Sequence, residues 1–213
     1  MSLRYGMVID LERCIGCYAC TIACKMENGI SQGSWIRVDT VGGQQIDTAK
    51  GEYPNLSMLY LPRLCMHCQD APCVEVCPTG ACYKREDGIV LVDYDKCVGC
   101  KYCIVACPYT TRYHNKEGSG YFAAEPTPDE KLGYQQHKLG AAEKCTLCMH
   151  RVERGEEPAC VEACPTSARH FGNLDDPQSE VSRLITSKYG APLLKDLGTK
   201  PSVYYLPPRR KQL

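Results

Sequence analysis

The chain has few of the large apolar side chains that usually build a protein core. It contains two Phe and one Trp in 213 residues. Its 14 Tyr do not replace them, because a buried tyrosine hydroxyl needs a hydrogen-bond partner. We therefore expect another kind of cross-link to help hold the fold together.

Net charge and long apolar runs are absent as well. The 25 basic and 25 acidic residues cancel, and no basic stripe predicts a nucleic-acid partner. No apolar run approaches the roughly 18 residues that a membrane-spanning helix needs; "LSMLYLP" is the length of a strand. The opening "MSLRYGMVIDLERC" has neither an apolar signal region nor a twin-arginine pair, so we expect no signal peptide.

Cysteine is abundant, with 17 residues. Sixteen of them fall into four tight sets, and tight sets favour shared metal centres over disulfides, which usually join distant segments. Cys82 is left over, and we expect it to serve as a small buried apolar residue. The sets are Cys14, Cys17, Cys20 and Cys24 (set one); Cys65, Cys68, Cys73 and Cys77 (set two); Cys97, Cys100, Cys103 and Cys107 (set three); and Cys145, Cys148, Cys160 and Cys164 (set four).

The four sets form an internal repeat. "DLERCIGCYACTIACK" aligns without a gap on "DYDKCVGCKYCIVACP", and "PCVEVCPTGA" aligns on "ACVEACPTSA". The order along the chain is therefore A, B, A′, B′, which indicates a duplicated module. Sets one and three have the C-x2-C-x2-C-x3-C run that holds [4Fe–4S] clusters in bacterial ferredoxins, although Lys25 replaces the usual following proline in set one. We expect the fourth cysteine to begin a short helix and to ligate the other cluster of a pair.

Zinc is the alternative interpretation. Set four alone could form a structural zinc site with four thiolates, and set two resembles a zinc knuckle in its spacing. The repetition of B beside A favours iron–sulfur clusters for all four sets.

The spacing between the sets predicts which of them pair. Only 19 residues separate Cys77 from Cys97, and they read as one hairpin with a turn at Asp87-Gly88. Longer segments of 40 and 37 residues follow Cys24 and Cys107. The predicted ligand sets are Cys65, Cys68, Cys73 and Cys107; Cys97, Cys100, Cys103 and Cys77; Cys14, Cys17, Cys20 and Cys164; and Cys145, Cys148, Cys160 and Cys24.

These pairs predict an α+β fold of duplicated ferredoxin-like modules, two 2[4Fe–4S] units with a loop insertion, a C-terminal helix and an extended tail. Residues 1–64 with 140–172 would form an outer module, 65–112 an inner module, 113–139 an insertion loop, and 173–213 a helix and tail for subunit docking. Asp176 is the expected N-cap of that helix and Pro177 its first residue, with Val181, Leu184 and Ile185 on its apolar face. The helix either covers the core or docks on a partner, and "YYLPPRRKQL" is expected to be an extended arm.

Nearly the whole chain resembles the four-cluster iron–sulfur subunits of molybdopterin oxidoreductases of the dimethyl sulfoxide reductase superfamily. The resemblance lies in "GMVIDLERCIGCYACTIACKMEN", "LCMHCQDAPCVEVCPTGA", "EKCTLCMHRVERGEEPACVEACPTSAR", "FGNLDDPQSEVSRLI" and "LGTKPSVYYLP". It is strongest toward the subunits of polysulfide, thiosulfate and arsenate reductases, which have the same nested pairing. The segment 113–142 departs from the shortest relatives and carries no motif.

The resemblance implies a non-catalytic electron-transfer subunit with four [4Fe–4S] clusters. Its implied partners are a large catalytic subunit with molybdenum or tungsten bound to pterin, and a quinone-reactive membrane subunit. The complex would lie on the outer face of the cytoplasmic membrane, exported with the large subunit, or alternatively in the cytoplasm. The same role in a hydrogenase, formate dehydrogenase or transhydroxylase complex is an alternative. A self-contained enzyme would require a three-cysteine site or a substrate pocket, and the sequence has no sign of either.

Side chains around the cysteines are also candidates for contact with the clusters. Oxidised clusters with their thiolates would carry about −2 each, and nearby lysines would offset part of this charge. Lys25 and Lys101 are the candidates for binding close to a cluster, and Lys96 and Lys144 are the other lysines beside the cysteines; each could equally be a solvated surface residue. His67 and His150 are expected near the clusters or at the surface, without ligating iron.

Overall fold

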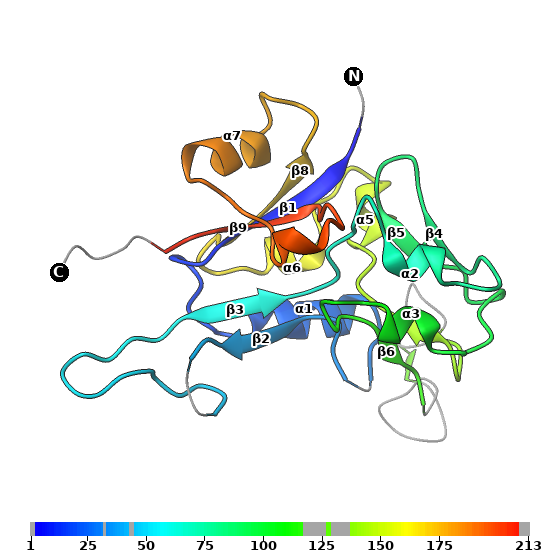
Figure 1. The fold of residues 1–213 in the computed structure, drawn as a ribbon, viewed down its shortest axis with the longest axis horizontal. Helices are drawn as coiled ribbons and strands as arrows, with labels where there is room; N and C mark the ends of the chain where they lie inside the picture. Colours follow the sequence, from blue (N-terminus) through cyan, green and yellow to red (C-terminus); the bar gives the residue numbers. More distant parts are fainter. Residues whose placement is uncertain (1–2, 32, 43–44, 117–126, 129–136, 209–213) are drawn as a thin grey trace.

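The computed structural model describes residues 3–31, 33–42, 45–116, 127–128 and 137–208. Over these ranges the chain forms short helices and four small sheets, in agreement with a mixed α+β architecture (Figure 1). Among the described residues, no helix has the length and apolar character needed to cross a bilayer.

The three-stranded sheet joins the two ends of the chain. Strand β1 (Tyr5–Asp10) lies between β8 (Arg169–Asn173), to which it is antiparallel, and β9 (Val203–Leu206), to which it is parallel. Both faces are covered: Met7 and Ile9 point into the main core, whereas Val8 packs with residues from the C-terminal helix. Because set one follows β1 and set four precedes β8, this sheet holds those two distant sets side by side.

Three two-stranded sheets complete the strand pairing. The hairpin expected between sets two and three is present as β4 (Cys82–Lys84) and β5 (Val90–Val92). Strands β2 (Arg37–Thr40) and β3 (Tyr60–Arg63) are antiparallel. Strands β6 (Tyr113–His114) and β7 (Ala142–Glu143) join the two ends of the segment 113–142, so the expected loop has a paired base. Residues 117–126 and 129–136 of the insertion lie outside the described residues.

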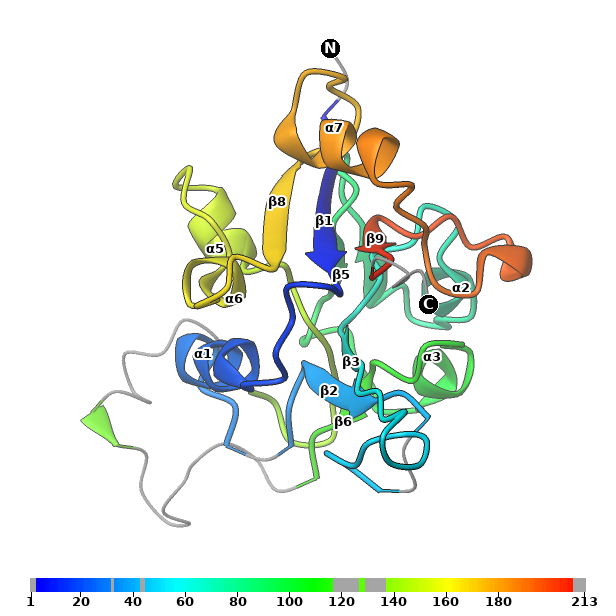
Figure 2. The same ribbon diagram turned by 90° about the vertical axis from the view of Figure 1, so that its left-hand side faces the viewer.

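The helices beside the cysteines are short, and four of them pack in two pairs. They are α1 (Ala19–Glu27), α2 (Pro72–Glu75), α3 (Tyr102–Val105), α5 (Met149–Val152) and α6 (Ala159–Glu162). Helix α1 contacts α6, and α2 contacts α3, as Figure 2 shows on opposite sides of the molecule. The prediction that the fourth cysteine begins a helix is wrong. Helices α1, α2, α3 and α6 each contain the third cysteine of their set; α1 continues through Cys24, whereas the other three end before the fourth cysteine.

The C-terminal region differs from two predictions. Helix α7 (Glu180–Ser187) begins after Ser179, whose side chain accepts a hydrogen bond from the Ser182 amide at 3.2 Å. Asp176 is not the N-cap, because its carboxylate accepts from the Gln178 amide in the preceding turn. The expected arm is also wrong as far as Leu206: after the 3-10 helix η1 (Lys195–Leu197), these residues form β9 inside the sheet, because their alternating side chains fill both of its faces.

Candidate iron–sulfur sites

The sixteen motif thiols gather into four groups in the structure, each drawn from two sets. Site I contains Cys14, Cys17, Cys20 and Cys164, which line one hollow. Site III contains Cys65, Cys68, Cys73 and Cys107, which line a second. Site IV contains Cys77, Cys97, Cys100 and Cys103, which line a third together with Cys82.

Site II contains Cys24, Cys145, Cys148 and Cys160, all of them buried. Burial and then the neighbouring Cys145, Cys160 and Cys148 raise the pKa of Cys24 well above that of a free thiol. The amide nitrogen of Asn28 lies 3.7 Å from the Cys24 sulfur and 4.0 Å from the Cys148 sulfur, so it joins the two halves of the site. Thiols in such surroundings stay protonated unless a metal displaces the proton.

The spread of the sulfurs bears on what these sites can hold. Among the described residues, no three His, Cys, Asp or Glu side chains converge closely enough for a single metal ion. Four sulfurs around a hollow fit a group with four separate iron atoms to ligate, and sixteen thiolate donors in four groups fit four [4Fe–4S] clusters.

A left-handed backbone residue lies two positions after the first cysteine of every set. These residues are Gly16, His67, Gly99 and Leu147, with φ between 44° and 71°. In set four this conformation points the Leu147 amide at the Cys145 sulfur, 3.4 Å away. Glycine accepts positive φ without cost, whereas the histidine and leucine are held there by the fold.

The last cysteines of sets two and four accept similar hydrogen bonds, although the amide donor lies five residues after Cys77 and four residues after Cys164. The Cys77 sulfur accepts from the Cys82 amide at 3.3 Å, and the Cys164 sulfur accepts from the Ala168 amide at 3.2 Å. A threonine hydroxyl lies 3.8 Å from Cys77 and 3.7 Å from Cys164. Burial raises the pKa of both thiols, but these hydrogen bonds outweigh it and leave both pKa values below the ordinary value, which favours the thiolate.

His67 is completely buried beside site III, so the surface alternative for it is wrong. Its Nδ1 atom accepts the Val90 amide at 3.0 Å. Burial is the largest effect on the ring, and the pKa of His67 is lowered, so the ring is neutral at pH 7 with its proton on Nε2. The Cys65 sulfur is the strongest electrostatic neighbour of this ring.

His150 is buried as well. Its Nε2 atom lies 2.6 Å from Glu27 Oε1, and Arg151 donates to the other oxygen of Glu27 at 3.0 Å. This cluster ties α5 to the end of α1 beside site II.

The lysines differ in what they contact. Lys25 donates to the carbonyls of Ser31 and Gly33, so it supports the turn after α1. Lys101 is exposed and lines the hollow of site IV. Lys96 is exposed and pairs with Asp93. Lys144 is fully buried and donates to the carbonyls of Val90 and Cys145, so it is no surface residue.

Sequence reasoning missed two buried arginines, Arg112 and Arg169, which contact the sulfur atoms of Cys82 and Cys160 respectively. A signal for them was present in the repeat. Each follows the last cysteine of its set by five residues, after a Cys-Pro pair.

Comparisons with known proteins identify iron–sulfur domains along this chain. Residues 56–124 and 127–174 match a family described as a 4Fe-4S dicluster domain, and residues 13–81 match a second family of the same description. Together these matches span all sixteen motif cysteines. Two dicluster domains correspond to four [4Fe–4S] clusters, so iron–sulfur is correct and zinc is not.

Full-length relatives carry the similarity beyond the cysteine motifs. The chain is 49% identical over 211 residues to a protein of Halobacterium salinarum named as an iron-sulfur subunit of dimethyl sulfoxide reductase; the alignment covers 95% of this chain and 79% of that protein. It is 40% identical to the iron-sulfur subunit of arsenate respiratory reductase of Shewanella sp., covering 96% of each. It is also 40% identical to a polypeptide of the polysulfide reductase of Wolinella succinogenes, covering 99% and 97%.

Proposed function

Since this chain belongs to the iron–sulfur subunits of dimethyl sulfoxide reductase-family enzymes, we propose that it relays electrons inside a respiratory oxidoreductase complex. Its partners are a large molybdopterin catalytic subunit, with molybdenum or tungsten, and a quinone-reactive membrane subunit. When bound, a [4Fe–4S] cluster with four thiolate ligands exchanges one electron and offers no open position to a substrate. The chain therefore conducts electrons and leaves substrate chemistry to its partner.

We assign one cluster to each of sites I to IV, with the four cysteines of each site as ligands. The gathering of four thiols from two sets at each site is the observation that carries this assignment. Sites I and II belong to the outer module, formed by 1–64 and 140–172. Sites III and IV belong to the inner module, formed by 65–112.

The clusters follow the order I, II, III, IV along the electron path. Two observations support this order. The middle sites are the more buried, whereas Cys17 of site I and Cys100 of site IV are exposed. Cys65 of site III is also among the charged neighbours that raise the pKa of Cys145 of site II, after burial itself and Cys160. An electron enters at one exposed end and leaves at the other.

The two exposed ends are suited to subunit docking. Ile15, at 58% exposure, lies between two ligands of site I, and Val98, at 69%, lies in the equivalent place at site IV. Exposed apolar side chains at both ends favour contact with a protein partner at each. Helix α7 and the insertion 113–139 are further proposed docking segments, whereas β9 is buried inside the sheet.

The electron acceptor or donor is determined by the catalytic subunit. The names of the relatives cover dimethyl sulfoxide, arsenate and polysulfide reduction. We propose an oxyanion or a sulfur compound as the substrate of the complex. The complex is associated with the cytoplasmic membrane, with this subunit on its outer face.

Metal analysis of the complex, purified gently from native membranes, tests this function. The expected result is about 16 iron per copy of this chain, with molybdenum or tungsten in a large pterin-containing partner. Nickel in place of these metals, or no second metal, would overturn the molybdoenzyme assignment. Tight zinc with little iron would overturn the electron path itself.

A further inference from the structure

Two arginines are buried among the cysteines, and within the described part of the chain neither forms an ion pair with a carboxylate. Arg112 is 4% exposed and Arg169 is 3% exposed. In each, the Nη2 atom has no hydrogen-bond partner among the described residues, and Nη1 contacts sulfur. A guanidinium stays charged in any protein environment, and burying its charge unpaired is costly. Their burial therefore requires negative charge nearby.

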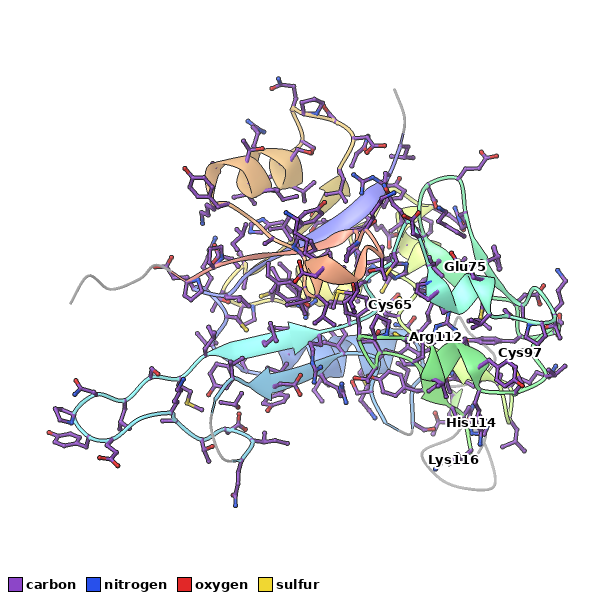
Figure 3. All side chains as sticks on the ribbon, in the orientation of Figure 1. Cys65, Glu75, Cys97, Arg112, His114 and Lys116 are labelled. Atoms are coloured by element: carbon purple, nitrogen blue, oxygen red, sulfur yellow. The ribbon has the colours of Figure 1, made fainter. Side chains whose placement is uncertain are left out.

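Arg112 lies between the two sites of the inner module. Its side chain lines the hollow of site III. Its Nη1 atom donates to the Cys82 sulfur at 3.2 Å, and Cys82 lines the hollow of site IV. In Figure 3, Arg112 lies between Cys65 of site III and Cys97 of site IV.

Arg169 has the same relation to the outer module. Its side chain lines the hollow of site I. Its Nη1 atom lies 3.7 Å from the sulfur of Cys160, a residue of site II, and 3.3 Å from the sulfur of Met7 in β1. Each module thus holds one guanidinium that reaches both of its sites.

The two arginines lie in different types of repeat copy. Arg112 follows Cys107 by five residues, in the A′ copy, and Arg169 follows Cys164 by five, in the B′ copy. The equivalent positions in the other two copies are Gly29 and Cys82. Each module therefore has one buried arginine at this position of the repeat, in the A′ copy for the inner module and in the B′ copy for the outer module.

Burial lowers the pKa of both guanidinium groups. The surrounding thiolates raise the pKa by more than burial lowers it, so both pKa values are above the ordinary value. For Arg112 these thiolates come from both sites of its module: Cys73 and Cys65 from site III, and Cys103 from site IV. Full charge on the arginines matches the negative charge that cluster sites carry.

We propose that Arg112 and Arg169 set the reduction potentials of the cluster pair in their own modules. This inference rests on the proposed function, because it assumes that the clusters cycle between two charge states. One-electron reduction adds one negative charge to a cluster and moves no proton. A fixed positive charge beside the cluster stabilises the reduced form, so each arginine raises the midpoint potentials of both clusters it reaches.

The test is redox titration of the purified complex, followed by electron paramagnetic resonance. The neutral variants are Arg112→Gln and Arg169→Gln, and the charge-retaining variants are Arg112→Lys and Arg169→Lys. Arg183→Gln is the matched control. Arg183 is exposed on α7, so this variant removes the same charge away from the four cysteine sites. Iron per chain and the four potentials are measured for each.

We expect each neutral variant to change the reduction equilibrium of both clusters in its own module tenfold toward the oxidised form. This change lowers each midpoint potential by about 59 mV for one electron. The other module should shift less, and the lysine and control variants should stay near the parent. Unchanged potentials in the neutral variants would overturn the proposal. Equal shifts in the lysine variants would also overturn it, because the shape of the side chain and not its charge would then matter. Loss of iron from the neutral or the lysine variants would overturn it as well, because the side chain would then be needed for cluster assembly. Fewer than four reducible clusters in the parent complex would contradict the proposed function instead.

Discussion

At the scale of the residue, the left-handed turns inside the cysteine loops are the tightest local requirement. Gly99 has a φ of 71°, and a Cβ atom there would collide with the carbonyl oxygen of Gly140. Gly80 has a similar φ of 65° with no atom within 4 Å of the same position. The two glycines share backbone strain but differ in the space around them.

Substituting Gly99→Ala should therefore disturb site IV more than Gly80→Ala. The strain shared by both variants is about 1–2 kcal/mol, and the collision adds to it at position 99 alone. We expect Gly80→Ala to keep about 16 iron per chain and Gly99→Ala to fall toward about 12. Iron and labile sulfide analysis measures this. Equal iron in the two variants would show that the contact with Gly140 is unimportant.

Cys82 is buried, as expected, and also accepts a hydrogen bond from Arg112. It shares the hollow of site IV with four proposed ligands. We expect Cys82→Ala to keep all four clusters, with a loss of about 1 kcal/mol from the broken hydrogen bond.

Cys77→Ala is the matched comparison, since Cys77 lines the same hollow. This variant should lose iron from one cluster, which iron analysis and paramagnetic resonance would detect. Loss of iron from Cys82→Ala with retention in Cys77→Ala would reverse the ligand assignment.

At the scale of the element, α7 is attached to the sheet by polar contacts as well as by its apolar face. Val181 of the helix packs on Val8 and Leu206. At the other end, Lys188 Nζ lies 2.8 Å from a carboxylate oxygen of Asp10, which is 2% exposed at the end of β1. Asp10 also accepts the amides of Glu12 and Arg13, where the chain turns into the loop of site I.

The ion pair between Lys188 and Asp10 makes the stability of the fold depend on pH. Burial raises the pKa of Asp10, but Lys188 and the two amides outweigh it, so the pKa lies below the ordinary 3.8. A folded-state pKa below the unfolded value gives stability that is present above the unfolded pKa and is lost as pH falls through the folded one. Lys188→Met should therefore cost about 1–3 kcal/mol near pH 7 and less below about pH 4.

Anaerobic melting of the two proteins as a function of pH measures this difference. For a chain of this size, roughly 2–4 °C of melting temperature correspond to each kcal/mol. Lys195→Met is the control, since Lys195 is exposed in η1. A difference between Lys188→Met and the parent that grew on acidification would contradict the assigned direction.

At the scale of the whole molecule, the proposed cluster ligands are part of the hydrophobic core. Cys24, Cys65, Cys68, Cys145 and Cys160 belong to the main core beside Trp35 and the apolar residues of β1. These cysteines come from sites II and III, the middle of the proposed electron path. Removing the clusters would leave the centre of the protein with unfilled space, which the few large side chains of this sequence cannot occupy.

Iron removal by an oxidant and a chelator should therefore proceed in two phases. Sites I and IV, with exposed Cys17 and Cys100, should lose iron first, about half of the total. Loss from sites II and III should coincide with loss of the near-ultraviolet circular dichroism and with rapid proteolysis. Iron release and circular dichroism, recorded together, measure this order. A single phase, or a native spectrum after complete iron loss, would contradict it.

The sequence by itself determined the features that depend on short-range spacing. The four cysteine sets, the A, B, A′, B′ repeat and the β4–β5 hairpin all follow from residues close together in the chain, and the sets and the repeat predicted the cofactors. The family was predicted from a resemblance that extends over nearly the whole chain. Spacing alone also predicted which sets lie together, because a 19-residue connection leaves few alternatives.

Only the tertiary structure decided the features that depend on distant partners. Leu206 belongs to a strand because β1, some 200 positions earlier, offers it a pairing edge. Lys144, Arg112 and Arg169 look like surface residues in the sequence, yet packing from several segments buries them against carbonyls and thiols. A charged side chain reveals its burial only through the groups that compensate its charge, and those groups lie far away along the chain.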